Sequence, residues 1–188
     1  RADFSPSLDA LRARVPSVHE VLYLLFNEGY LSAHADSAIR RELCDEAIRL
    51  ATLLSGHPLG DVPETFALLA LMHFHAARLS GRVDAAGCLL LLEEQDRALW
   101  DRDQIRVGIE WLARSASGDR FSRYHAEAGI AAEHCSARSF HETRWKEIVD
   151  LYALLDRISP SPLHTLNRAV AIAEWQGVDA ALAMLDEI

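Results

Sequence analysis

Apolar and charged residues alternate with helical spacing over much of the chain. Between residues 36 and 55, apolar side chains such as Ile39, Leu43 and Ala47 fall three or four positions apart, with charged residues between them. This spacing places the apolar side chains on one side of an α-helix and the charges on the other. The segment therefore predicts an amphipathic helix that begins after Asp36 and ends at the glycines and proline of residues 56–60.

Two segments are more uniformly apolar than a surface helix requires. Residues 18–26 are apolar on nearly every side, and a second apolar segment runs from Pro63 to Leu79. Because a helix that is apolar all round is normally buried, both are expected in the interior, the second as a central helix. Glycines and prolines then separate further expected helices at 102–115, 121–135, 142–158, 163–176 and 178–188.

Signals for helix starts recur along the chain. In each, a hydroxyl or carboxylate suited to cap a helix is followed three positions later by an acidic or amide residue. The four pairs are Ser17 with Glu20, Asp61 with Glu64, Asp101 with Gln104, and Ser139 with Glu142. Their separations of 44, 40 and 38 residues are close to the period of two-helix repeats. We therefore expect an all-α fold of about eight to nine helices in stacked pairs, forming one domain over residues 1–188.

Helical spacing fails between residues 80 and 100. Gly81 and Gly87 flank a non-periodic stretch, and residues 88–92 form a short apolar run. We expect an irregular connection here, with a short strand or extended piece laid across the helices, between N-terminal helices in 1–79 and helix pairs in 101–188. A polar and aromatic cluster follows, and its candidate interaction residues are Asp96, Arg97, Trp100 and Asp101. The alternative is that these residues only hold the helices together.

A second polar cluster follows the apolar residues 18–26. It consists of Asn27, Glu28, Gly29 and Tyr30. Gly29 is expected to end a helix in the left-handed conformation, with Tyr30 making the hydrophobic contact of the cap. Asn27 and Glu28 either satisfy neighbouring backbone groups or face a partner, and both alternatives remain open.

The last 45 residues resemble tetratricopeptide repeats, which gives a solenoid-like array as the expected fold. Trp145, Ile148, Val149 and Tyr152 follow the Trp, Leu, Gly, Tyr spacing of a first repeat helix, although Val149 replaces the small residue. Alternatively, Tyr152 and Pro160 are the late aromatic residue and the closing proline of a second helix.

Charge and hydropathy limit the classes of partner. The chain has 28 acidic and 19 basic residues, a net charge of −9, and such a surface repels the phosphates of nucleic acid. No apolar run is long enough to cross a bilayer, so neither nucleic acid nor membrane is expected as a direct partner. We expect a cytoplasmic protein. Because the sequence opens with Arg1 and not with methionine, we also expect it to be part of a longer chain.

The three cysteines are widely spaced, which favours reduced, buried thiols over disulfides or a zinc site. Cys135, next to His134 at an expected helix end, is the one whose surroundings could lower its pKa.

Motifs for catalysis or for cofactor binding are absent from the sequence. His73 and His75 point in different directions on a helix, and Trp145 stands where a zinc-protease helix beginning at His141 needs its second histidine. No glycine-rich phosphate loop occurs. We therefore expect no metal, no cofactor and no enzyme, with a small enzyme using a Cys/His or Glu/His site as the least favoured alternative.

Five segments of the chain resemble the C-terminal extension of a group of bacterial extracytoplasmic-function RNA polymerase sigma factors. They are residues 21–30 (VLYLLFNEGY), 40–54 (with LCDEAIRL), 68–78 (LLALMHFHAAR), 90–101 (with LLLEEQDR and then WD) and 159–171 (with LNRAVA). The order and separations of the five segments match, and the likeness spans almost the whole chain.

The resemblance implies a regulatory interaction module that follows a sigma core, which is not contained in these residues. Its implied partners are its own sigma core, RNA polymerase or a signalling protein, and a concave groove between helix pairs would suit a peptide or helix. The acidic surface could mask a basic region of the core, or the module could act positively. A free-standing helical scaffold is the second alternative.

Overall fold

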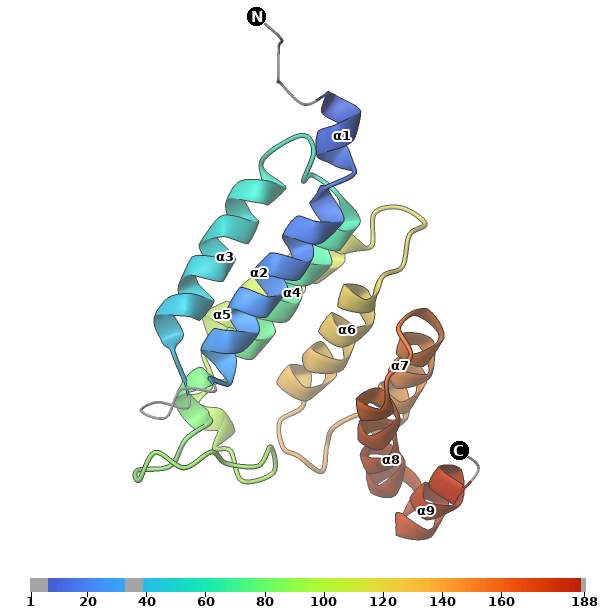
Figure 1. Cartoon of the computed structure of the whole chain (residues 1–188). Helices are drawn as coiled ribbons and strands as arrows, with labels where there is room; N and C mark the ends of the chain where they lie inside the picture. Colours follow the sequence, from blue (N-terminus) through green and yellow to red (C-terminus); the bar gives the residue numbers. More distant parts are fainter. Residues whose placement is uncertain (1–6, 33–38, 187–188) are drawn as a thin grey trace, which may run out of the picture.

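The structure of the protein is a computed structural model that describes residues 7–32 and 39–186, and within these residues the chain forms an array of α-helices (Figure 1). The helices are α1 (Leu8–Arg12), α2 (Val15–Tyr30), α3 (Arg41–Ser55), α4 (Pro63–Ala77), α5 (Arg102–Ser115), α6 (Arg123–Ser136), α7 (Trp145–Ile158), α8 (Pro162–Gln176) and α9 (Val178–Asp186). The all-α prediction is confirmed. The start expected at Asp36 lies outside the described residues.

Helix α4 is the central helix that the sequence predicts. It packs against α2, α3, α5 and α6, and nearly all its side chains are buried, including Leu68, Leu69 and Phe74. Pro63 occupies the first turn, where the missing proline N–H has no helical partner to lose. Burial of such large apolar side chains typically contributes about 1.5–3 kcal/mol each, so α4 holds the two main hydrophobic clusters together.

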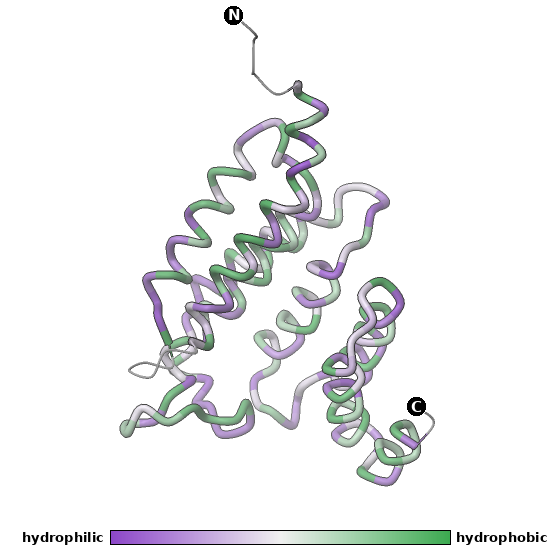
Figure 2. The backbone as a smooth tube through the Cα atoms, viewed as in Figure 1, coloured by the Kyte–Doolittle hydropathy of each residue, from purple (hydrophilic) through white to green (hydrophobic). Residues whose placement is uncertain are grey.

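Helix α2 is less buried than its sequence predicts. Leu22 and Phe26 face the interior, but Val21 and Leu24 are 63% and 62% exposed. The expectation that residues 18–26 are buried all round is therefore wrong. The reason is position, because α2 packs on α3 and α4 and leaves its other side uncovered. Figure 2 shows that hydrophobic residues recur along this helix.

Only one of the four expected caps begins a helix. The Asp101 carboxylate accepts hydrogen bonds from the backbone N–H groups of Asp103 and Gln104, at 2.9 and 3.1 Å, and α5 follows. Ser17 lies inside α2, which begins at Val15. Asp61 precedes the cap residue of α4 and bonds Arg114 at 2.9 Å instead.

The fourth expected cap, formed by Ser139 and Glu142, does not begin a helix either. Ser139 and Glu142 do bond to each other, but in the turn before α7, which begins at Trp145. Ser122 caps α6 with His125 in the place of the usual Glu, a capping box that the sequence analysis missed. An imidazole nitrogen can accept the same backbone N–H as a carboxylate.

Neighbouring helices along the chain pack side by side, which confirms the stacked pairs. Helices α2 and α3, α4 and α5, and α7 and α8 are in contact, and α8 continues into α9. In Figure 1, α6 lies between the α2–α5 group and the group of α7, α8 and α9. Ile148 and Leu155 of α7 are buried in a third cluster with residues of α6, α8 and α9. Helix α6 therefore joins the two groups, because it packs against α4 on one side and α7 on the other.

The connection between α4 and α5 is irregular, as expected. It contains two 3-10 turns, η1 (Leu79–Gly81) and η2 (Arg97–Leu99), and a single antiparallel bridge between Val83 and Leu89. The expected strand is limited to that bridge, because Gly87, with φ +83°, turns the chain back at once. Among the described residues, no helix is both long and apolar enough to cross a membrane.

Candidate interaction groove

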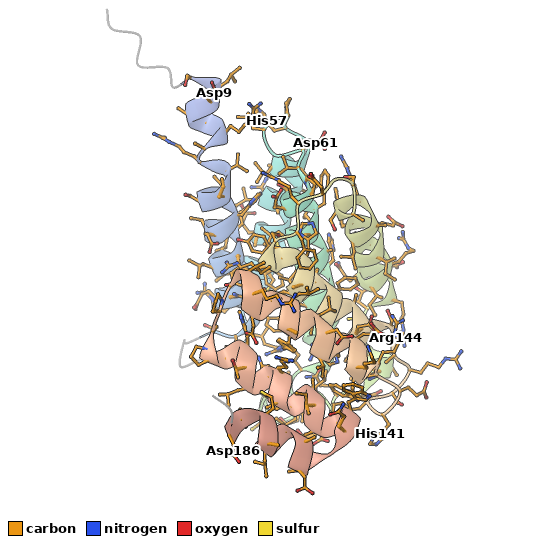
Figure 3. All side chains as sticks on the ribbon, turned by 90° about the vertical axis from the view of Figure 1, so that its right-hand side faces the viewer. Asp9, His57, Asp61, His141, Arg144 and Asp186 are labelled. Carbon is orange, nitrogen blue, oxygen red and sulfur yellow. The ribbon has the colours of Figure 1, made fainter. Side chains whose placement is uncertain are left out.

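Two adjoining cavities form a groove that is bordered by α6, α7, α8 and the irregular connection between α4 and α5. The first has a volume of about 360 Å³ and the second about 290 Å³. Both are lined by Leu92 of the irregular connection, His134 of α6, Tyr152 of α7 and Asn167 of α8. We call the two cavities together the groove. Figure 3 views the molecule from the side of α7 to α9, with Arg144 marking the start of α7.

Several aromatic side chains line the first cavity. The Trp145 ring meets Phe140 at a centroid distance of 4.9 Å and His134 at 5.4 Å, with the ring planes at 64° and 69°. Two exposed acidic residues, Glu93 and Glu174, also line this cavity. The cavity therefore combines ring surfaces with negative charge, and no Lys or Arg is among its described lining residues.

The second cavity is lined by several titratable groups. The Tyr23 hydroxyl lies near the side chains of Asn27 and Glu127, and burial raises the pKa of both Tyr23 and Glu127. Burial, followed by the nearby Glu127 charge, raises the pKa of Tyr152 to about 12. Arg78 also lines the cavity and donates to the Gln95 side-chain oxygen at 3.3 Å. This cavity therefore carries both a cation and a carboxylate.

Two histidines of the groove are uncharged at neutral pH. Burial lowers the pKa of His75 to about 3, with the charges of Arg78 and Arg82 acting in the same direction. The pKa of His134 falls to about 3 for the same reasons, burial first and then Arg78 and Arg97. Both imidazoles therefore act as aromatic and polar surface, without a positive charge.

Acid is expected to destabilise the fold through His134. The unfolded histidine has a pKa of 6.5 and the folded one about 3, so the unfolded state binds more protons between these values. Its contribution is complete above pH 6.5 and falls as the pH drops toward 3, by about 2 kcal/mol at pH 5. Urea unfolding at pH 7 and pH 5 should show a smaller loss in His134→Gln than in the wild type. Equal losses of stability in the variant and the wild type would contradict the lowered pKa of His134.

The cluster of residues 27–30 lies at the end of α2, beside the groove. Tyr30 stacks on Phe26 at a centroid distance of 5.9 Å and lies against His75 at 4.7 Å with the ring planes tilted by 40°. The Arg82 guanidinium lies 3.5 Å from the Tyr30 ring centroid. Asn27 contacts the Tyr23 hydroxyl, whereas Glu28 is exposed and accepts a bond from Ser32 at 2.9 Å.

Gly29 has a different role from the one expected. It lies within α2 and not after it, and positive φ among the described residues occurs only at Gly87, Gly118 and Gly177. A Cβ atom on Gly29 would stand 2.7 Å from the Arg40 carbonyl oxygen and the Cys44 backbone nitrogen. The expectation of a left-handed cap is therefore wrong. The missing side chain instead lets α3 approach α2 closely.

The cluster of residues 96–101 holds helix ends together. The buried Arg97 donates to the carbonyl oxygens of His134 and Ala137 (2.9 Å to the latter), at the end of α6, and its guanidinium lies 4.6 Å from the Trp100 ring centroid. The Asp96 side chain caps η2, and the Asp101 N–H bonds to Ala77 at the end of α4.

The last turn of α4 joins the two clusters. The His75 ring contacts Tyr30, while the Arg78 guanidinium lies 5.3 Å from the Trp100 ring centroid, and His75 and Arg78 both line the second cavity. The structure therefore brings both candidate clusters to one end of the groove. Sequence analysis placed Trp145 and Tyr152 only in a tetratricopeptide-like spacing and Asn167 only in the LNRAVA segment. Glu127 was missed because no local pattern marks it.

The cysteines differ from the expectation in two respects. Cys44 and Cys135 are buried, but Cys88 is exposed. The expectation of a lowered pKa at Cys135 is wrong, because burial raises its pKa to about 11 despite nearby arginines, and burial likewise raises that of Cys44 to about 11.

Only one thiol of the native protein is expected to react rapidly with a thiol reagent. Cys88 is accessible, whereas Cys44 and Cys135 are buried and protonated at neutral pH. Absorbance during labelling with an aromatic disulfide should show one fast equivalent, and two more after addition of denaturant. The variant Cys88→Ser should lose the fast phase, and a second fast equivalent in the native wild type would contradict the burial.

Within the described ranges, no group of three or more His, Cys, Asp or Glu side chains is placed to hold a metal ion.

The protein is an all-α array of stacked helix pairs with a groove formed by two adjoining cavities. The family of unknown function DUF6596 matches residues 14–116, more than half of the chain, and the chain belongs to this family. The uncharacterized protein R00370 of Rhizobium meliloti (strain 1021) is 41% identical over 175 residues, which cover 93% of this chain and 41% of that relative. The chain thus spans about two fifths of the relative's length. No solved structure is significantly similar to it.

Proposed function

We propose that the chain is the regulatory interaction module of a bacterial extracytoplasmic-function sigma factor and that it modulates transcription initiation through contacts with the sigma core, polymerase or a signalling partner. The observation that carries the proposal is the groove, which runs along stacked helix pairs and joins both candidate clusters at one end. Helix arrays commonly use such concave surfaces to hold a peptide or a helix.

Two further observations support the sigma-factor part of the proposal. The five segments that resemble sigma-factor extensions include the end of α2, the last turns of α4 and the start of α8, which all contribute residues to the groove. The R. meliloti relative also has more than half of its length outside the matched region, which leaves room for a sigma core. The net charge of −9 favours protein partners with a basic surface.

Association with polymerase tests this proposal directly. The intact R. meliloti relative, mixed with core RNA polymerase of the same organism, is expected to comigrate with it in size-exclusion chromatography. Removing the region that matches this chain is expected to change the transcripts induced when the relative is overproduced. A relative that neither comigrates with polymerase nor changes any transcript would overturn the proposal and leave the free-standing scaffold.

An enzyme is the second candidate, and one observation favours it. Glu127 has a raised pKa and lies with Tyr23 and His164 around the second cavity, as general acid–base groups often do. However, no Ser, Thr or Cys is among the described lining residues of either cavity, and Tyr23 already contacts Glu127. The arrangement therefore suits binding better than nucleophilic catalysis.

A further inference from the structure

We infer that the first cavity of the groove binds the side chain of an arginine or lysine from a basic segment of the partner protein. This inference rests on the proposed function, because it names the chemistry of the partner that the groove would hold. The occupant is a polypeptide segment, and its cationic side chain enters between the irregular connection, α7 and α8.

The aromatic lining provides the first argument. Phe140, Trp145 and Tyr152 line one cavity of about 360 Å³, and Trp145 meets Phe140 edge to face. In such a pair one ring turns its edge to its neighbour, and both of these rings border the cavity. A guanidinium or ammonium group within about 6 Å of an aromatic face is attracted by the negative face of the ring.

The charge of the lining provides the second argument. Glu93 and Glu174 contribute two carboxylates from different elements, the irregular connection and α8. His134 stays neutral at pH 7, since its pKa is about 3. Arg78 and Arg97, whose charges help to lower the pKa of His134, are buried and bonded to Gln95 and to backbone carbonyls at the end of α6. A positive side chain therefore meets complementary charge at the open side of this cavity.

The flanking surface favours a peptide over a free cation. Leu91, at the irregular connection, and Val170, on α8, are 65% and 59% exposed and line the same cavity. On the adjoining second cavity, Leu163 is 62% exposed. These apolar side chains would contact the apolar residues of a helix or extended segment while its basic residue occupies the cavity.

Titration with N-acetyl-arginine amide tests the cavity itself. In proton–nitrogen NMR spectra, the indole signal of Trp145 is expected to shift saturably at millimolar ligand. The indoles of Trp100, Trp111 and Trp175, which do not line the cavity, serve as internal references. N-acetyl-citrulline amide, which has the same shape without the charge, is the matched ligand and should leave Trp145 unshifted. Equal shifts with both ligands, or no shift with either, would overturn the inference.

Variants test the named residues. Combining Glu93→Gln with Glu174→Gln is expected to weaken arginine binding about fivefold, and Trp145→Leu to abolish it. The control Trp175→Leu removes an exposed indole of α8 outside the cavity and should leave binding unchanged. Trp145 also packs in the third hydrophobic cluster, so Trp145→Leu could unfold the protein. The double variant Glu93→Gln, Glu174→Gln, called the glutamine pair, changes only exposed carboxylates and keeps the test valid in that case. Unchanged binding in that pair would overturn the inference.

Overlapping peptides test the choice of partner. Peptides covering the R. meliloti relative outside its matched region are incubated with this chain and with the glutamine pair. Bound peptides are expected to contain an arginine or lysine, and replacing it with citrulline or acetyl-lysine should release them. Bound peptides that lack a basic residue would overturn the inference, as would an absence of binding. Polymerase association of the intact relative would in either case be unaffected, so the two failures are distinguishable.

Discussion

The variant Gly29→Ala is expected to lose about 3 kcal/mol of the free energy of unfolding. The added Cβ would stand 2.7 Å from the Arg40 carbonyl oxygen and the Cys44 nitrogen and 2.8 Å from the Cys44 sulfur. Two of these are backbone atoms, which cannot move aside by a rotamer change, so α3 has to separate from α2. Loss of the short bond from the Arg40 N–H to the Gly29 carbonyl, 2.7 Å, would add to the effect. Urea unfolding followed by circular dichroism measures the free energy of unfolding of the variant and the wild type.

The matched control is Gly56→Ala at the end of α3. Gly56 has φ −83°, which alanine adopts readily, and the nearest atoms to its Cβ position are 3.6 Å away. We expect its stability to stay within about 0.5 kcal/mol of the wild type. If both alanine variants were equally stable, the close approach of α2 and α3 would be refuted.

Truncating Arg97 to alanine is expected to lower stability by a similar amount, about 3 kcal/mol. The buried guanidinium satisfies two carbonyl groups at the end of α6 and lies over Trp100. Hydrogen bonds from a charged donor contribute about 1.5–3 kcal/mol each, and the variant leaves two part-buried carbonyls without this donor. The stability of Arg97→Lys should fall between those of the wild type and Arg97→Ala, because an ammonium group cannot reproduce the planar fork of donors.

Arg106→Ala is the control for Arg97. Arg106 is also an arginine with hydrogen-bonded contacts, to Glu110 at 2.7 Å, but its side chain is 61% exposed. Exposed ion pairs contribute about 0–1 kcal/mol, so thermal and urea unfolding should change little. Equal effects of the two substitutions would show that Arg97 does not hold α6 to the irregular connection.

These variants also separate a structural from a regulatory role for residues 96–101. Arg97→Ala and Trp100→Ala are expected to reduce stability, whereas Asp96→Ala removes only the exposed cap of a 3-10 turn. If Asp96→Ala changed the transcripts produced by the intact protein at unchanged melting temperature, a direct contact with a partner would follow. Transcript changes that only accompany lower melting temperatures would favour the structural role.

Much of the helical framework was predictable from the sequence. The segments expected at 102–115 and 163–176 correspond within one residue to α5 and α8, because glycine, proline and capping residues act on the nearest backbone. The short α1 was missed, since five residues carry little periodicity. Helix starts at Ser17 and Asp61 were wrong because a proline lies close to each position and fits the first helical turn, so it competes with the cap.

The sequence alone determined that the chain is all-α, where most helices end and which segment is irregular, because these properties depend on residues within a few positions of one another. Only the tertiary structure decided that α2 exposes Val21 and Leu24, that Gly29 serves close packing, and that Cys135 is shielded. It also brought Leu92, His134, Tyr152 and Asn167 around common cavities. Periodicity specifies which side of a helix is apolar, but the neighbour that covers it depends on contacts between distant residues.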